Sequence, residues 1–172
     1  MKEYVVPLDG ERQLLLELNK RSDVEAERLR RYLDLPDLSR ATDSPIYALV
    51  EQAKKLPLFE NFDIITIPEI VSIKVSFDLF NFAPDHPARS RSDTYYVDEQ
   101  HILRTHDTVM WYYYLNHPEI KKKIAAQEPL GVLCYGKVYR KDEIDRQHLN
   151  VFHQMGGLYL VPASQQTLRL DD

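Results

Sequence analysis

The sequence of 172 residues lacks the features that mark several classes of protein. It has one cysteine, Cys134, so it forms no internal disulfide, and no Cys/His spacing typical of a zinc site is present. It contains no run of about 18 apolar residues. Its first residues, Met1–Tyr4, do not begin the apolar stretch of a signal peptide. We therefore expect a cytoplasmic protein without a membrane span.

A net positive charge is also absent, and glycine is scarce. The net charge of −5 argues against a basic nucleic-acid coat protein, although a local basic patch would still allow contact with RNA. Five glycines and ten prolines, with no biased tract, argue against long disordered segments. The content of 44% hydrophobic and 28% charged residues is that of one globular domain with a substantial core.

Residues 11–34 carry the pattern of two short helices. The second is predicted to begin at Ser22, whose spacing to Glu25 is that of a capping box. Such a pair is either a helix-turn-helix element or a plain helical hairpin that packs on the main domain, and the hairpin is the commoner use. Residues 11–34 carry six basic and six acidic residues, so the pair has no net positive charge, which argues against a DNA-binding regulator. We expect residues 1–40 to form an N-terminal helical segment and residues 41–172 to form the main domain.

The rest of the sequence mixes helix and strand patterns. A helix is predicted to begin with Ser44 as its cap and Pro45 at its first position. Further helices are expected over 110–115 and 120–127. Strands are expected at 62–68, 94–97, 102–104 and 132–135, and a hairpin at 137–140 and 152–160. Because the hairpins are too short for parallel crossovers, we predict an α+β fold with an antiparallel sheet flanked by helices.

One polar segment, Gly136 to Gln154, combines residue types that suit nucleotide chemistry. The guanidinium of Arg140 is suited to phosphate, and the ring of Phe152 is suited to stacking on a base. Each residue also has a plain structural alternative. Arg140 could form a surface salt bridge with Asp142 or Glu143, and a strand phenylalanine more often packs in a core.

This segment resembles motif 2 of class II aminoacyl-tRNA synthetases, in the form found in phenylalanyl-tRNA synthetases. The loop from Asp85 to Tyr96, with its Asp-His-Pro-Ala-Arg sequence, and the segment Leu103–His106, with Arg-Thr-His, resemble substrate-facing segments of that family in the same order. The predicted helix at Ser44 and the strand ending at Pro68 resemble motif 1, which forms a dimer interface in the family. The resemblance covers roughly residues 43–160.

The resemblance implies an ATP site, with Mg²⁺ bound together with the nucleotide rather than at a separate metal site. Arg140 would hold the α-phosphate and the amino-acid carboxylate, and would stabilise the charge that grows on the phosphate oxygens. Phe152 would stack on adenine, and His148 would lie near the triphosphate. Glu143 is assigned to the same ATP site.

The resemblance also implies sites for phenylalanine and for the end of tRNA. His106, Thr108 and Gln154 would bind the amino-acid end of phenylalanine. A lone histidine at a strand end is more often structural, so the role of His106 follows from the resemblance alone. Arg89 and Arg91 would lie near the 3′ end of tRNA.

Three positions depart from the family pattern. Thr108 stands where serine is usual, Trp111 stands where glutamine is usual, and Gly156 stands where glutamate is usual. A missing carboxylate beside an ammonium site would weaken phenylalanine binding by about 1.5–3 kcal/mol. Asp107 is a candidate to supply that charge from the other side.

The sequence ends at Asp172 without a segment that resembles motif 3 of the class II enzymes. We therefore expect part of a phenylalanine–tRNA ligase core, which activates phenylalanine with ATP and transfers it to tRNA(Phe). The alternative is a non-catalytic relative that acts as a dimerisation or nucleotide- or RNA-binding module. In either case the motif 1 helix and strand imply a partner, which is a second copy or another synthetase subunit.

Overall fold

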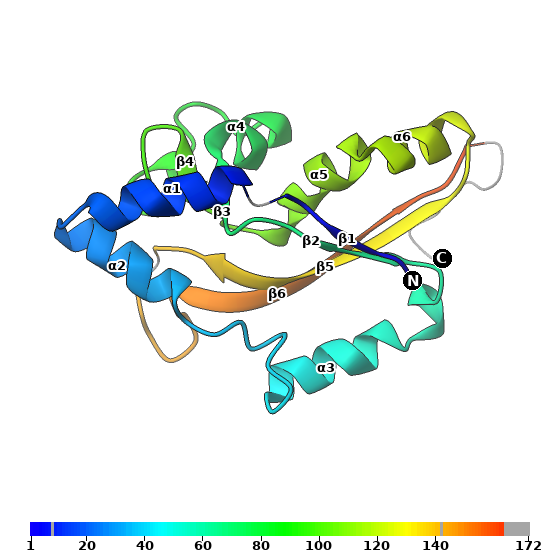
Figure 1. Cartoon of the computed structure of the whole chain (residues 1–172), viewed down its shortest axis with the longest axis horizontal. Helices are drawn as coiled ribbons and strands as arrows, with labels where there is room; N and C mark the ends of the chain where they lie inside the picture. The colour runs from blue at the N-terminus through cyan, green and yellow to red at the C-terminus, as the bar shows by residue number, and fades with distance from the viewer. Residues whose placement is uncertain (8, 142, 164–172) are drawn as a thin grey trace.

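The computed structural model describes residues 1–7, 9–141 and 143–163, and a long antiparallel hairpin runs through its centre (Figure 1). The hairpin consists of β5 (Leu130–Tyr139) and β6 (Val151–Leu160), which pair over their full length. Two shorter strands, β1 (Glu3–Val5) and β2 (Asp63–Thr66), complete a sheet in the order β1-β2-β5-β6. The hairpin is therefore the element that positions any site built on this sheet.

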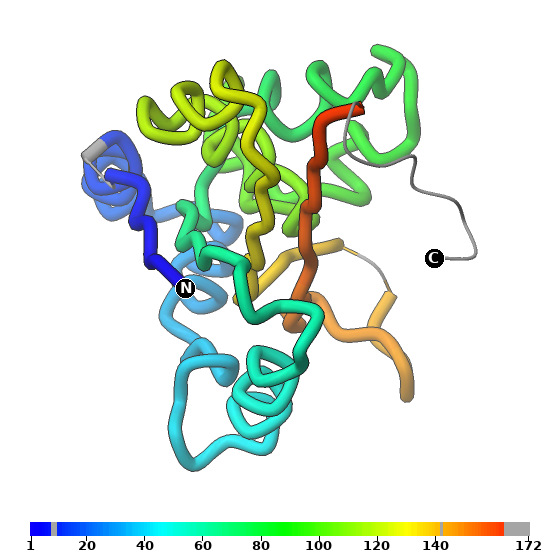
Figure 2. The backbone as a smooth tube through the Cα atoms, turned by 90° about the vertical axis from the view of Figure 1, so that its right-hand side faces the viewer, coloured from blue at the N-terminus to red at the C-terminus, as the bar shows by residue number. Residues whose placement is uncertain are grey.

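Helices cover both faces of this sheet, and Figure 2 shows the strands between them. One face carries α3 (Pro45–Lys54), and the other carries α5 (Met110–Asn116) and α6 (Pro118–Ala125). α1 (Asp9–Lys20) and α2 (Val24–Leu33) lie at one end of the sheet (Figure 1). None of the helices in the described ranges is both long enough and apolar enough to cross a bilayer.

A second sheet and several short turns fill the region near the end of β5. This sheet pairs β3 (Ile70–Ser72) with β4 (His101–Leu103) in antiparallel fashion. A single-turn helix, α4 (Ile73–Ser76), follows β3. The remaining regular elements are short 3₁₀ turns at Pro57–Phe59, Asp78–Phe80, Pro87–Arg89 and Asp107–Val109.

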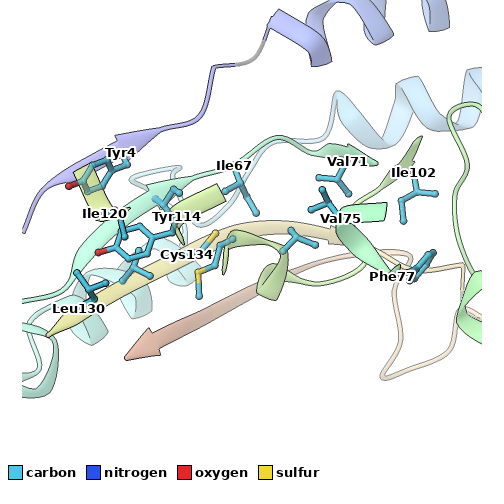
Figure 3. Packing of buried hydrophobic residues seen from close by; sticks show 14 residues of the cluster. Tyr4, Ile67, Val71, Val75, Phe77, Ile102, Tyr114, Ile120, Leu130 and Cys134 are labelled. Atoms are coloured by element: carbon cyan, nitrogen blue, oxygen red, sulfur yellow. The ribbon is translucent and has the colours of Figure 1, made fainter. Parts of the chain in front are cut away.

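The main hydrophobic core lies between the larger sheet and the pair α5 and α6 (Figure 3). Alternate residues of a strand point to the same face, so β5 places Val132 and Cys134 under these helices. Burial raises the pKa of the Cys134 thiol to about 11, which keeps it neutral. The opposite face has a smaller cluster, in which Val50 of α3 packs against Ile64 and Tyr135.

One buried hydrogen bond links this core to β2. The hydroxyl of Tyr114 donates to Asp63 Oδ2 at 2.9 Å, and Tyr114 is 1% exposed. We expect Tyr114→Phe to lower the free energy of unfolding by about 1–2 kcal/mol, since the carboxylate loses a buried donor. Urea denaturation measures this change. Tyr112→Phe, at a residue that is 40% exposed, is the matched control and should change stability by less than about 0.5 kcal/mol. Equal losses in both variants would contradict this account of the core.

The helix pair packs on the main part of the molecule as a helical hairpin does. Its apolar side chains share one cluster with residues from the second sheet, from β5 and from the segment before β4: Leu18, Ala26, Leu29, Tyr95, Leu103 and Tyr139. The first residues of the chain also join the large sheet, because β1 pairs with β2. The division of the chain at residue 40 remains a prediction.

The predicted helix starts are correct at one helix and shifted at another. Ser44 caps α3 as expected, and its hydroxyl accepts from the Ile46 N–H at 3.1 Å. The prediction that Ser22 caps α2 is wrong by one residue. Asp23 is the cap, because its carboxylate accepts from the Ala26 N–H at 3.0 Å. Arg21 pairs with the same carboxylate and lowers the pKa of Asp23 to about 2.

Two strand predictions also change. The segments 132–135 and 137–140 were expected as separate strands but belong to one strand, β5. Gly136 connects them with a φ of 150°, a conformation that favours glycine. A β-carbon there would lie 2.5 Å from Arg104 Nη2, so glycine also allows that side chain to approach. The segment 94–97 is not a strand, since it forms only the isolated bridge from Tyr96 to Ile102.

The predicted sheet flanked by helices is confirmed, but its strand pairing is mixed. β5–β6 and β3–β4 are antiparallel as expected. β1–β2 and β2–β5 are parallel. The prediction of antiparallel pairing assumed connections too short for a parallel crossover, and this holds for β5 and β6 but not for β1 and β2. Helices α1 to α3 lie between β1 and β2, so this connection is long enough for a parallel crossover.

Candidate active site on the β5–β6 hairpin

The face of β6 that points toward α5 carries Phe152, Gln154 and Gly156. These residues alternate along the strand, and Gly156 lies opposite Cys134 in the ladder. Cys134 belongs to the core under α5 and α6, which fixes the side on which the three residues lie. His153 points to the other face, where its Nε2 accepts from the Leu38 N–H at 2.9 Å. The sequence-predicted residues of β6 therefore share one face.

Arg140 follows directly after β5 and lies over the ring of Phe152. The guanidinium carbon is 5.3 Å from the ring centroid. Its Nε donates to the Thr105 carbonyl at 3.2 Å, and its backbone is held by reciprocal hydrogen bonds with Asn150 at 3.0 and 3.1 Å. Among the described residues Arg140 forms no ion pair with Glu143. Asp142, the other predicted partner of Arg140, lies outside the described residues. Within the described part of the chain the side chain of Arg140 donates only from Nε, so its terminal N–H groups suit an anionic ligand.

Arg140 and His106 line a cavity of about 270 Å³ beside the hairpin. Its remaining walls come from the loop after α4 and from Thr105: Phe77, Phe82, Ala88, Asp93, Thr94 and Thr105. A larger cavity of about 360 Å³ lies elsewhere, next to the helix pair. Four carboxylates, Glu11, Asp34, Asp37 and Glu69, line that cavity, so it is poorly suited to a polyphosphate.

His106, which lines the smaller cavity, forms a local pair with Thr108, which does not line it. His106 Nδ1 lies within hydrogen-bond distance of the Thr108 hydroxyl, and His106 Nε2 is 3.2 Å from the carbonyl of Ser76. If Nε2 carries the proton, it donates to Ser76 and Nδ1 accepts from Thr108. Burial lowers the pKa of His106, which favours this neutral form. The threonine oxygen keeps acceptor capacity for a ligand.

Asp107 connects the loop to β6. Its backbone N–H donates to Gln154 Oε1 at 3.1 Å. Its carboxylate lies against Gly156, where a β-carbon would be only 2.1 Å from Asp107 Oδ2. Burial raises the pKa of Asp107, while backbone N–H groups, His106 and Arg104 act in the opposite direction. A carboxylate thus occupies the space that a side chain at position 156 would fill.

Of the four residues assigned to the ATP site, only Arg140 lines this cavity; Phe152 lies beside it, under the Arg140 guanidinium. The other two lie farther out. Glu143 and His148 are exposed in the loop between β5 and β6. His148 Nδ1 is 2.9 Å from both carboxylate oxygens of Asp145. Hydrogen bonds lower the pKa of Asp145; the largest effect comes from the backbone N–H of Gln147 and the next from His148. Their assignment to bound nucleotide stays a prediction.

The arginines expected near the tRNA end have different surroundings. Arg89 donates to Asp78 Oδ1 at 2.6 Å and to the Phe82 carbonyl at 2.8 Å, so it braces its own loop. Arg91 is exposed and pairs with Glu99 at 2.7 Å. A surface salt bridge of this kind is weak and is easily exchanged for phosphate. Arg91 is the more accessible of the two for a nucleic-acid ligand.

Arg104 is a supporting residue whose importance the sequence did not reveal. It is 4% exposed, and its guanidinium donates to the carbonyls of Lys137, Ile67 and Pro68 at 2.7, 3.0 and 3.4 Å. Its position directly before Thr105 and His106 is the only sequence signal of this role. Arg104 therefore holds the site loop to β5 and does not belong to an exposed basic patch.

Comparison with known proteins identifies the family of this site. The family model described as "tRNA synthetases class II core domain (F)" matches residues 32–166. The chain belongs to this family. The phenylalanine–tRNA ligase alpha subunit of Pelodictyon phaeoclathratiforme is 34% identical over 124 residues, which cover 69% of this chain and 34% of that protein. The alpha subunit of Phytoplasma australiense is 31% identical over 164 residues, which cover 92% of this chain and 44% of that protein. The resemblance found in the sequence is thereby confirmed.

A solved structure shows the same class II synthetase fold. Pyrrolysyl-tRNA synthetase from Desulfitobacterium hafniense aligns with a TM-score of 0.53 and 20% identity, over 86% of this chain and 57% of that chain. The chain spans less than half of the length of the two phenylalanine–tRNA ligase subunits given above. It corresponds to one portion of a class II synthetase core.

Proposed function

We propose that this chain contributes the nucleotide-binding and amino-group-binding part of a phenylalanine–tRNA ligase. The reaction is the activation of phenylalanine by ATP, followed by transfer to tRNA(Phe). The observation that carries the proposal is one shared surface: the Arg140 guanidinium lies over Phe152 at a cavity that His106 also lines. Gln154 lies on the same face of β6.

Arg140 and Phe152 are the residues best placed for ATP. A planar guanidinium can bind the α-phosphate and a carboxylate at once, and in-line attack depends on this positioning more than on acid–base catalysis. Charge builds up on phosphate oxygens during the attack, so a fixed cation lowers the barrier. The ring of Phe152 offers a flat surface to adenine, and Arg140 packs against that ring.

Magnesium would enter this site with ATP. The described residues contain no cluster of three or more His, Cys, Asp or Glu side chains that could hold a metal ion. This donor set fits Mg²⁺ only as a nucleotide complex, because Mg²⁺ commonly takes its ligands from phosphates, water and one or two carboxylates. When bound, the ion neutralises phosphate charge; the residues of this chain position the nucleotide.

The amino-acid end of phenylalanine would bind beside the phosphate site. Gln154 Oε1 already accepts one hydrogen bond from Asp107 and has a second lone pair for an ammonium. The Thr108 oxygen, oriented by His106, is a further acceptor. Arg91, exposed on the neighbouring loop, is the candidate contact for the tRNA end, with Arg89 bracing that loop.

The motif 1 helix α3 and the turn after it offer a surface for a partner subunit. Leu49 is 65% exposed and Leu58 is 72% exposed. The similar proteins are named as alpha subunits, which implies a second type of subunit in those enzymes. We propose that α3 contacts such a subunit, or a second copy of this chain.

The test is phenylalanine-dependent exchange of pyrophosphate into ATP, measured with the chain alone and with a purified synthetase partner subunit. The proposal predicts exchange that requires phenylalanine in at least one of these mixtures. The alternative is a non-catalytic binding module. Binding of ATP or RNA with no exchange in either mixture would favour that module and overturn the enzymatic role.

A further inference from the structure

Asp107 carries a partly buried carboxylate that forms no ion pair with the residues that the structure describes. The backbone N–H of Asp107 donates to Gln154 Oε1, and the carboxylate interacts with the backbone N–H groups of Asp107 and Thr108. A carboxylate removed from water costs free energy unless it is paired or protonated. The raised pKa of Asp107 is the expected response to this burial.

The neighbouring charged groups do not neutralise it. Arg104 attracts the carboxylate electrostatically, but its Nε and Nη1 donate to the carbonyls of Lys137, Ile67 and Pro68 and not to Asp107. His106, the preceding residue, has a lowered pKa and is neutral near pH 7. Cys134 on β5 is also neutral, since burial raises its pKa. The carboxylate is therefore available to a cationic ligand.

Gly156 determines where this carboxylate can lie. A β-carbon at position 156 would be 2.1 Å from Asp107 Oδ2 and 2.9 Å from Asp107 Cγ, so any larger residue would displace the carboxylate. Gln154 is two residues away on the same face of β6 and accepts from the Asp107 backbone. Asp107 thus has its backbone N–H at Gln154 and its carboxylate at Gly156.

We propose that Asp107 binds the α-ammonium group of the amino-acid ligand beside the Gln154 amide, with its carboxylate held in the space that Gly156 leaves open. The inference rests on the proposed amino-acid site. It adds a residue that provides the counter-charge for the ligand cation. The ligand class is an α-amino acid with a free ammonium group.

A definite pH dependence follows from this role. The carboxylate binds a cation only when ionised, so affinity for the ammonium increases as the pH rises through the raised pKa of Asp107. The pKa of Cys134, about 11, is far above this range. Only His106 titrates nearby. Asp107→Asn should therefore remove the part of the pH dependence that belongs to the carboxylate.

The experiment compares two ligands by isothermal titration calorimetry on the full chain, with partner subunit if exchange requires it. Phenylalanine should bind Asp107→Asn about 10- to 100-fold more weakly than the unaltered chain. 3-Phenylpropanoate, which has no ammonium, should bind both proteins equally or bind the variant more tightly. Equal affinity of both proteins for phenylalanine overturns the inference. An equal loss for both ligands also overturns it, because it indicates a purely structural role.

A charge-relocation variant provides a second arm. Gly156→Glu alone should weaken phenylalanine binding, since the new side chain collides with the Asp107 carboxylate. Adding Asp107→Ser removes that collision and places a carboxylate in the same space from β6. The double variant should bind phenylalanine at least tenfold more tightly than Asp107→Ser alone. No recovery would contradict an electrostatic role for this position.

Stability gives an independent readout. A group whose pKa is raised in the folded state stabilises the protein at low pH and loses that contribution as the pH rises through the folded-state pKa. At neutral pH the ionised Asp107 therefore lowers the free energy of unfolding of the ligand-free chain. Asp107→Asn should raise the melting temperature of the ligand-free chain by about 2 °C or more while it weakens phenylalanine binding. A lowered melting temperature would indicate a structural carboxylate.

The ligand panel separates this inference from the proposed function. If phenylalanine binds and Asp107→Asn binds it equally well, the inference alone fails. If another α-amino acid binds in place of phenylalanine and loses affinity in Asp107→Asn, the proposed function fails and the inference stands. If no α-amino acid binds to the unaltered protein, both fail.

Discussion

Arg140→Ala is expected to lower the rate of phenylalanine-dependent ATP–pyrophosphate exchange by a factor of about 10²–10³. The reason is the loss of a fixed cation at the point where charge develops on the α-phosphate. Arg140 is exposed and makes a single side-chain hydrogen bond within the described structure, to Thr105, so the fold should tolerate its removal. The exchange rate at saturating phenylalanine is the measurement.

Two further variants sharpen this result. Arg31→Ala removes an exposed arginine from α2, far along the chain from the hairpin, and should leave the rate unchanged. Arg140→Lys keeps the charge but loses the planar pair of donors, so it should retain only part of the activity. A rate for Arg140→Ala that equals that of Arg31→Ala would contradict a phosphate role for Arg140.

Arg104→Ala is expected to cause the largest loss of stability, about 3–5 kcal/mol. The substitution leaves three backbone carbonyls without their donor and opens a cavity next to Gly136. Since domains of this size are commonly stable by about 5–15 kcal/mol, much of the chain's stability would be lost. Urea denaturation followed by circular dichroism measures the change.

A conservative variant shows whether geometry or charge dominates at Arg104. Arg104→Lys keeps a buried cation, but a single ammonium cannot reproduce the fork that reaches Lys137 and Ile67 together. It should lose at least half as much stability as Arg104→Ala. A variant with the stability of the unaltered chain would show that Arg104 does not hold the site loop to β5.

The sequence predicted those parts of the fold that local patterns encode. Ser44 and Pro45 marked the start of α3 because a cap and a helix-compatible proline act within one turn. The hairpin β5–β6 followed from two β-rich segments around one polar loop. Class membership followed from ordered motifs, and the family match over residues 32–166 confirms it.

Features that depend on contacts far apart in sequence were not predictable in this way. β1 has only the residues Glu3–Val5, and its parallel pairing with β2 is set by helices between them. Gly136 resembled a break in a strand, but its φ of 150° continues β5 and makes room for Arg104. No local pattern encodes such an approach across 32 positions of chain between residues 104 and 136.

In the candidate site, too, local patterns predicted residues but not the contacts between distant segments. Motif spacing identified Arg140, Phe152 and Gln154, and alternation along β6 explains why Phe152 and Gln154 share a face. It also suggested Asp107 as a substitute charge. The contact between its carboxylate and Gly156 depends on how the loop after β4 lies against β6, which the sequence does not specify.

The most direct test of the central claim is the affinity of the chain for a non-hydrolysable phenylalanyl-adenylate analogue, measured by calorimetry beside phenylalanine and AMP. If one surface positions adenine, the α-phosphate and the amino acid together, the analogue should bind at least about 100-fold more tightly than either half alone. An analogue that binds no more tightly than the better half would show that Arg140, Phe152 and Gln154 do not form one activation site.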